Sequence, residues 1–328
     1  MTTVTERPAA TDPAPPRRPT RNLRRREENR TGVALVSPTL LIVLFVVVLP
    51  ILWTVMLAFQ NVRLVDIQSQ GLWGNWTLQN LERVFGSPGF WSSLWTTLVY
   101  TIGSTLGSIV VGLVAALALR KPFRGRALIR GAMLLPYVAP VVAVAFVWQV
   151  LLSPDLGVVN HWGTEWLGWD RPIAFLTQRS YEVLGVPVPM ALFTVIAFET
   201  WRYFPFAFLF LIARMQAVPA VLEEAAVVDG TTPWQRFRFI LLPQLLPVVA
   251  LLCVLRFIFT FNKFDDVYLL TGGGAGTDVV AVRVYRFLTA RFDVGLASAQ
   301  AVVLAVVLIV LLGLYFKFFG RKVQEEQS

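Results

Sequence analysis

Residues 34–59 read ALVSPTLLIVLFVVVLPILWTVMLAF, a stretch with no charged side chain. A helix of about 20 apolar residues crosses the ~30 Å hydrocarbon core of a bilayer, so this stretch is long enough to span a membrane. Five further apolar blocks follow at about residues 95–119, 129–152, 190–213, 240–261 and 296–319. Length and lack of charge, rather than periodicity, distinguish them from buried helices of a soluble protein. The sequence therefore predicts an all-α, polytopic membrane protein with six transmembrane helices.

The composition agrees with a membrane location. Of 328 residues, 56% are hydrophobic and 15% are charged, whereas soluble domains are about 45–50% apolar and about 25% charged. The net charge is +9, and the basic residues gather at the N-terminal end and in one short loop. Retention of Lys and Arg on the cytoplasmic side explains this pattern better than binding to nucleic acid. We therefore expect membrane lipid, and no nucleic acid, as a partner.

Residues 1–30 carry several prolines, eight arginines and few large apolar side chains. Such a segment cannot bury enough apolar surface to offset the entropy of ordering, so we predict a disordered basic cytosolic tail. The segment also lacks the apolar core of a signal peptide, and we expect it to remain inside the cell. Residues 31–320 then form the transmembrane domain, and residues 321–328 form a cytosolic C-terminus.

Basic residues in the connecting loops predict the orientation. The loop between the second and third spans carries five, at Arg120, Lys121, Arg124, Arg126 and Arg130. The loop between the fourth and fifth spans carries three, whereas those at 60–94 and 153–189 carry two each. The loop at 262–295 is balanced, and six spans with both ends inside place it outside. The positive-inside rule predicts a multi-pass protein of the bacterial plasma membrane with cytoplasmic N- and C-termini.

Small residues and prolines within the spans have structural consequences. Gly103 and Gly107 form a GxxxG pair, which lets another helix approach closely. Pro136 and Pro140 fall in the third block, and we expect them to kink its helix. Tryptophans in the outer loops fit an interfacial aromatic belt, or alternatively a docking surface for an extracytoplasmic partner.

The cytosolic loop at 217–243 contains Glu224-Ala225-Ala226, then Gly230, then Ile240 and Leu242-Pro243. Glu and Ala favour a short helix, Asp229-Gly230 is a helix stop, and Pro233 can begin a second helical turn. We expect this segment to lie flat at the cytosolic membrane edge. The simpler interpretation is an ordinary helical loop that ends at a C-cap glycine.

The spacing of this loop resembles the EAA loop of ABC-importer permeases, and the chain resembles the maltose-type, binding-protein-dependent sugar permeases. A second stretch, FNKFDDVYLLTGGG at 261–274, is similar to a run of that family, although Ala275 stands where the family often has proline. The resemblance implies the ABC type I importer permease fold and a coupling helix that binds the ATPase. The residues that it assigns to ATPase coupling are Glu224, Ala225, Ala226, Asp229 and Gly230. The implied partners are ABC ATPase subunits, a second six-span permease subunit and an extracytoplasmic sugar-binding lipoprotein.

Ionisable residues inside the spans indicate a substrate path, because such residues are costly in lipid and face a cavity or a partner. Glu199, Arg202 and Tyr203 share one face of the fourth span, with Trp201 close by. They form either an internal Glu199–Arg202 pair or a polar, aromatic wall suited to a sugar. On the fifth span, Arg256 faces either the same path or a carboxylate of a partner subunit. Further candidates for the path cluster beyond the outer end of that span, at Asn262, Asp265 and Asp266.

Enzymatic chemistry is not expected. The chain has one His, His161, and one Cys, Cys253, with no metal-ligand spacing and no catalytic set. The glycine run at 272–274 lacks the Gly-Lys-Ser/Thr ending of a nucleotide-binding loop. No cofactor is therefore predicted, and the energy for transport must come from a separate ATPase. The alternatives that remain are import of another solute such as glycerol phosphate, and a stand-alone channel or secondary transporter.

Overall fold

The computed structural model describes residues 33–70, 74–183 and 185–325. The predicted tail at 1–30 lies outside these ranges, and so do residues 326–328. The chain divides into two compact units, Met1–Thr54 and Val55–Ser328. The described part of the first unit is helical from Val33 onward, includes the π-helical turn η1 (Leu44–Val48), and continues into α2 (Leu49–Ala58).

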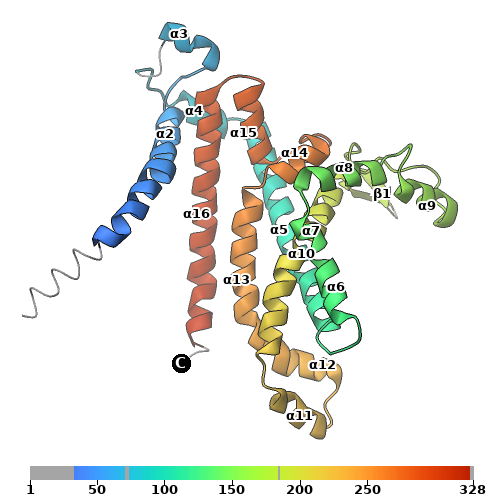
Figure 1. Ribbon diagram of the computed structural model, residues 1–328. Helices are drawn as coiled ribbons and strands as arrows, with labels where there is room; N and C mark the ends of the chain where they lie inside the picture. The colour runs from blue at the N-terminus through green and yellow to red at the C-terminus, as the bar shows by residue number, and fades with distance from the viewer. Residues whose placement is uncertain (1–32, 71–73, 184, 326–328) are drawn as a thin grey trace, which may run out of the picture. The chain divides into compact units, whose positions relative to one another are not determined.

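Five helices in the described residues are long and apolar enough to cross a membrane. They are Val33–Ala58, Pro88–Ala118, Met190–Gln216, Pro233–Phe261 and Val294–Lys317. The last four correspond to α5 (Pro88–Ala118), α10 (Met190–Gln216), α13 (Leu242–Phe261) and the first part of α16 (Val294–Glu325), shown in Figure 1. Each corresponds to one of the predicted apolar blocks. A bent pair of helices is the sixth span if the pair is counted as one.

The third predicted block is the one that departs from a simple span. It forms α6 (Arg126–Met133), α7 (Leu135–Val138) and α8 (Val141–Leu151), and the direction changes by 96° between Val138 and Val141. Ala139 is extended, with φ −65° and ψ 143°, because the ring of Pro140 disfavours a helical residue before it. The expected kink at Pro136 and Pro140 is therefore a break of the helix.

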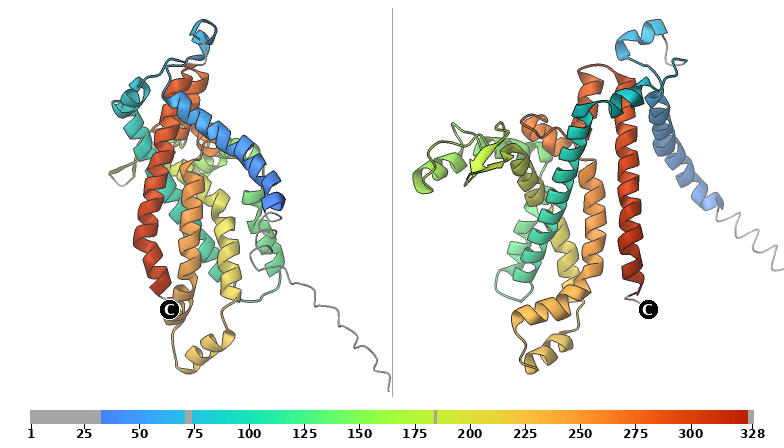
Figure 2. Two further views of the ribbon diagram at one scale, coloured as in Figure 1. Left: turned by 90° about the vertical axis from the view of Figure 1, so that its left-hand side faces the viewer. Right: turned by 180° about the vertical axis from the view of Figure 1, so that it is seen from behind.

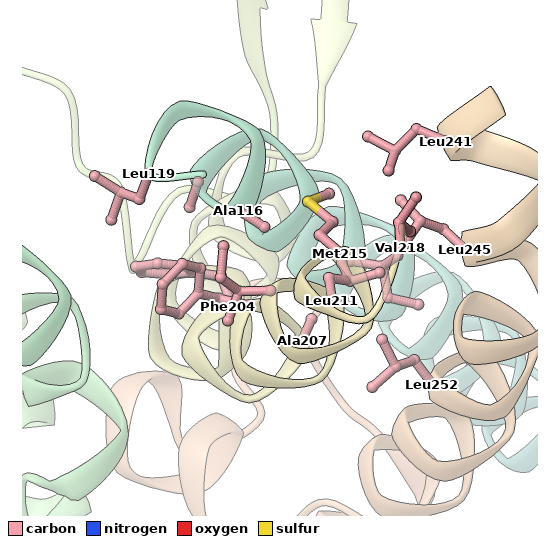
Figure 3. Packing of buried hydrophobic residues seen from close by; sticks show 14 residues of the cluster. Ala116, Leu119, Phe204, Ala207, Leu211, Met215, Val218, Leu241, Leu245 and Leu252 are labelled. Carbon is pink, nitrogen blue, oxygen red and sulfur yellow. The ribbon is translucent and has the colours of Figure 1, made fainter. Parts of the chain in front are cut away.

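The main contact of the second unit joins α5 to α10 along the predicted glycine face. A Cβ on Gly107 would lie 2.4 Å from Oγ1 of Thr200, and one on Gly112 would lie 2.8 Å from Cβ of Ala207. The helices thus approach more closely than any larger residue allows, and the expected role of the GxxxG pair is confirmed. Buried apolar side chains of α5, α10 and α13 fill the adjoining space (Figure 3).

Short elements lie at the two ends of this bundle (Figures 1 and 2). One end carries α11 (Ala220–Val228), α12 (Pro233–Arg236) and the π-helical turn η3 (Phe237–Leu241), which leads into α13. The other end carries the remaining elements: η2 (Leu64–Asp66), α3 (Ile67–Gln70), α4 (Gln79–Phe85), α9 (Val158–Trp166), α14 (Asp265–Thr271) and α15 (Val280–Thr289). It also carries an antiparallel hairpin of β1 (Tyr181–Val183) and β2 (Val186–Val188), which the sequence did not predict.

Candidate functional site

The Glu224–Gly230 segment ends a short helix in the way its sequence predicts. Helix α11 stops at Val228, the Gly230 N–H donates to the Val227 carbonyl at 3.0 Å, and the Thr231 N–H donates to the Ala226 carbonyl at 3.1 Å. This pair of bonds is a Schellman motif, which requires a left-handed residue after the helix. Gly230 supplies it with φ +74°, and no atom lies within 4 Å of a Cβ placed there. The expected stop at Asp229-Gly230 is confirmed.

A second short helix follows at once. The Thr232 hydroxyl accepts from the Gln235 N–H at 3.3 Å, and the Gln235 side chain accepts from the Thr232 N–H at 2.7 Å. These two bonds form a capping box, and Pro233 occupies the first helical turn, where its missing N–H has no cost. The chain is thus held in a helix–turn–helix at one end of the bundle, as the positions of Gly230 and Pro233 predict.

The predicted coupling residues differ in their exposure to solvent. Glu224, Ala225, Asp229 and Gly230 are exposed, whereas Ala226 is buried. Several apolar side chains of this segment are also exposed: Val221, Leu222, Val227, Val228, Trp234 and Phe239. An exposed apolar patch with acidic residues beside it is typical of a surface that binds a partner protein.

Helix α11 is also tied to the end of α5. The Glu223 carboxylate forms an ion pair with Arg120, which directly follows α5. Both side chains are half-buried. The sequence predicts only an orientation signal from Arg120 and no role for Glu223, because the pair joins segments about a hundred residues apart.

Inside the bundle, the predicted charged residues of α10 come together with those of α13 and α14. Arg256 donates to Glu199 at 2.9 Å and to the Ser108 hydroxyl at 3.4 Å. Arg202 pairs with Asp266 at 3.3 Å. The expected alternative of an internal Glu199–Arg202 pair is therefore wrong, since each residue pairs across the bundle. Arg256 takes its carboxylate from this chain, Glu199, and faces the predicted path.

Tyr203 lies at the centre of this ionic cluster. Nζ of Lys263 donates to the Tyr203 hydroxyl at 2.5 Å and lies 4.7 Å from the centre of its ring. The guanidinium of Arg256 lies 4.2 Å from the same centre. The guanidinium of Arg202 lies 5.5 Å from this centre as well, so three cations within 6 Å of one aromatic ring hold it by cation–π attraction. Tyr203 is thereby held as an aromatic surface among the charged groups of the cluster.

The ionic cluster opens into a cavity of about 260 Å³. Its lining comes from the α7 segment, α10 and α13, with Lys263 just after α13: Tyr137, Glu199, Tyr203, Phe206, Arg256, Phe259 and Lys263. Each cation of the cluster has a carboxyl partner in this chain: Arg202 pairs with Asp266, Arg256 with Glu199, and Lys263 with Asp265. Lys263 lies 3.3 Å from Asp265 and 3.6 Å from Asp266, which completes the pairing.

Five predicted path residues do not line this cavity. Arg202, Asp265 and Asp266 belong to the ion pairs beside it, and the other two, Trp201 and Asn262, make different contacts. Trp201 packs its ring against those of Trp148 and Phe198, at 5.6 and 6.4 Å between centres. The Asn262 amide is exposed and donates to the Ile258 carbonyl of its own helix at 3.0 Å. Conversely, Tyr137 was missed, because the break in the third predicted span brings it to the cavity and its local sequence gives no sign of this.

The sequence of this chain is similar to those of known transport proteins. Residues 108–325 match the family described as "Binding-protein-dependent transport system inner membrane component". The inner membrane ABC transporter permease protein YcjO of Escherichia coli (strain K12) is 34% identical over 280 residues, which cover 84% of this chain and 90% of that protein. The trehalose transport system permease protein SugA of Mycobacterium tuberculosis is 30% identical over 296 residues, covering 90% of this chain and 91% of SugA.

One solved structure shares the fold. It is a subunit of a bacterial ABC transporter involved in the import of the acidic polysaccharide alginate, with a TM-score of 0.75 and 24% identity. The match covers 92% of this chain and 99% of that subunit. The predicted permease fold is therefore confirmed.

Proposed function

Since the chain belongs to the binding-protein-dependent transport system inner membrane components, we propose that it is one membrane subunit of an ATP-driven importer of a neutral sugar. Among its relatives, SugA is named as a trehalose permease and MalF of Thermococcus litoralis as a trehalose/maltose permease, the latter 29% identical over 291 residues. The observation that carries the choice of a neutral solute is that the cations of the Tyr203 cavity, Arg256 and Lys263, are each paired with a carboxylate of this chain.

That pairing distinguishes a sugar from a phosphate ester. A relative from Yersinia enterocolitica is named as a permease for sn-glycerol 3-phosphate and is 35% identical over 205 residues, covering 61% of this chain and 65% of the relative. A phosphate is bound tightly where Arg or Lys side chains have no other anion. Here Arg202, Arg256 and Lys263 each face a carboxylate of this chain. A sugar hydroxyl can donate to those carboxylates and accept from the cations without displacing either.

The aromatic residues support the same choice. Tyr137, Tyr203 and Phe206 line the cavity together, with 5.8 Å between the ring centres of Tyr137 and Tyr203. An aromatic face buries the C–H surface of a sugar ring while hydroxyls at the rim make hydrogen bonds. The proposed substrate residues are therefore Tyr137, Tyr203 and Glu199, with Arg256 and Lys263 as the paired cations.

For the α11–α12 segment we propose the coupling role. Its exposed residues Glu224, Ala225, Asp229 and Gly230 would contact an ATPase subunit, and Ala226 would support them from inside. This role places α11 in the cytoplasm, with both chain termini, and places α4, α9 and α15 outside. The chain would form half of the translocation path with a second six-span permease and receive its sugar from an extracytoplasmic binding protein. It would perform no chemistry itself.

Transport in proteoliposomes tests the substrate. The importer, with its second permease and ATPase, is reconstituted and supplied with its binding protein, and uptake of labelled trehalose or maltose is compared with uptake of glycerol 3-phosphate. We expect ATP-dependent uptake of a neutral sugar and none of the phosphate ester. Uptake of the ester alone would contradict the argument from paired charges, and uptake without ATPase subunits would contradict the proposed machine.

The coupling role is tested by Gly230→Val. Valine at φ +74° is strained by about 1–2 kcal/mol, so the turn after α11 changes shape while the spans remain folded. We expect ATP hydrolysis to continue while uptake falls at least about tenfold, a ratio worth ~1.4 kcal/mol of coupling free energy. Gly125→Val is the matched control, because Gly125 has φ +83° and equally open space but lies before α6. Equal uptake by both variants would refute the role of α11.

A further inference from the structure

A second charged cavity lies at the end of the bundle opposite α11 and α12. It has a volume of about 640 Å³ and is lined by segments before α4, within α4 and around the α15–α16 connection: Asn61, Arg63, Val65, Arg83, Phe287, Ala290, Arg291, Phe292 and Asp293. We call it the arginine pocket. Neither the coupling role nor the Tyr203 cavity uses any of these residues.

Unlike the Tyr203 cavity, whose cations are each paired with a carboxylate, the arginine pocket contains arginines without an ion pair among the described residues. Its three arginines face one carboxylate, that of Asp293, which pairs with Arg83 at 3.3 Å. Within the described residues, Arg63 and Arg291 have no ion pair. The guanidinium of Arg291 lies 4.5 Å from the centre of the Phe287 ring, which holds its plane while leaving its N–H groups available. The pocket therefore presents two uncompensated positive charges.

The backbone around the arginine pocket is held in place. The Leu64 N–H donates to the Phe292 carbonyl at 2.8 Å, and the Gly295 N–H donates to the Val62 carbonyl at 3.0 Å. Phe292 adopts φ +53°, a left-handed conformation that costs a non-glycine residue about 1–3 kcal/mol and persists only where surrounding contacts impose it. These bonds fix the backbone of the two segments that carry Arg63 and Arg291, so a ligand that bridges the arginines need not order the backbone.

Arginines are disfavoured on the outer side of a membrane protein, where the positive-inside rule selects against them. On the proposed topology, the arginine pocket is nonetheless outside, and its guanidinium groups face water beyond the ends of the spans. Arginine forms planar, two-pronged hydrogen bonds with carboxylates, and exposed charge of this kind speeds and orients the encounter with an oppositely charged protein. The neighbouring Asn61, Phe287 and Asp293 add the mixed polar and apolar contacts of a protein interface rather than a bare phosphate site.

We propose that the arginine pocket is a docking site for acidic side chains of the importer's extracytoplasmic binding protein, with Arg63 and Arg291 as the residues that take the carboxylates. The inference rests on the proposed function, because it requires a soluble partner on this side of the membrane. It adds the chemistry of the contact and the residues that make it.

The test uses the complete importer in nanodiscs of neutral lipid, with ATPase activity measured against the concentration of its own binding protein. The double variant Arg63→Glu/Arg291→Glu should raise the half-stimulating concentration at least about tenfold, or ~1.4 kcal/mol, while basal and maximal activities stay unchanged. The control Arg171→Glu reverses the charge of another exposed arginine on the proposed outer surface, and it should leave the half-stimulating concentration unchanged. Raising the salt concentration should weaken stimulation of the wild type and affect the double variant much less.

Cross-linking then tests for a direct contact between the arginine pocket and the binding protein. In Arg63→Lys and Arg291→Lys, a carbodiimide should join the new amine to a carboxylate of the binding protein, and mass spectrometry should identify the acidic residue. Unchanged stimulation of the double variant, with no cross-link, overturns the docking site while leaving the importer intact. An effect seen only in anionic lipid would instead assign the pocket to a lipid phosphate. A wild type that its binding protein does not stimulate would refute the proposed function.

Discussion

Replacing Arg256 by methionine tests whether the ionic cluster holds the bundle together. Arg256 is 2% exposed and Glu199 is fully buried, so the substitution leaves a carboxylate without its cation in a low-dielectric interior. Breaking one partner of a buried pair costs about 3–5 kcal/mol, and the contact with the Ser108 hydroxyl is lost as well. At roughly 2–4 °C per kcal/mol, the melting temperature of the detergent-solubilised protein should fall by on the order of 10 °C.

The double variant Glu199→Gln/Arg256→Met tests whether the unpaired Glu199 carboxylate causes the loss of stability. With both charges removed, most of the lost stability should return, because the dominant penalty is the unpaired carboxylate rather than the missing attraction. Melting is followed by fluorescence-detected size-exclusion chromatography after heating. Asn262→Ala is the control, since that exposed amide bonds only within its own helix, and it should melt like the wild type. If the double variant loses as much as the sum of the single variants, the pair is not a coupled ion pair and the reasoning fails.

Other outcomes follow from the packing and the cavity. Gly112→Leu should destabilise the α5–α10 contact by about 1–3 kcal/mol, because even a Cβ at this position would lie 2.8 Å from Cβ of Ala207. Gly131→Ala is the control for the same melting assay: a Cβ there meets open space, so the melting temperature should not change. Tyr203→Ala should raise the KM for sugar uptake several-fold more than Tyr203→Phe, since only the first removes the aromatic surface; equal effects would assign the role to the hydroxyl. Glu223→Gln should reduce uptake per ATP hydrolysed, because it releases α11 from Arg120; unchanged coupling would make that pair structural only.

Local features of the fold were accessible from the sequence. The length of an apolar block sets a span, a left-handed glycine ends α11, and glycines four residues apart permit the approach of α5 to α10. Each depends on residues that are close together in the chain, so spacing alone carries the information. The identity of the charged residues in the candidate cavity was accessible for a similar reason, since an ionisable side chain in an apolar block must face something other than lipid.

The pairing of those charges was not accessible. Glu199 and Arg202 are neighbours on one helix face, yet each takes a partner from α13 or α14, because the buried interface brings opposite charges within 3.3 Å. The same limit applies to Tyr137, which reaches the cavity through a 96° break. Prolines predict that a helix is disturbed, but the size of the bend depends on what the two halves pack against.

The connections between α11 and the cavity determine which helices would move when an ATPase subunit displaces α11. The helical stretch Pro233–Phe261 has 29 residues and therefore extends about 40 Å from the coupling segment to the end of the ionic cluster. Helix α10 is tied to the same stretch where Arg214 donates to the Gln244 carbonyl at 3.1 Å, and α5 is tied to α11 through Arg120 and Glu223. The cavity walls are in turn joined by buried ion pairs that cost several kcal/mol to break. We therefore expect α5, α10 and α13 to move as one body, so that access to the cavity changes where this chain meets the second permease and not within the chain.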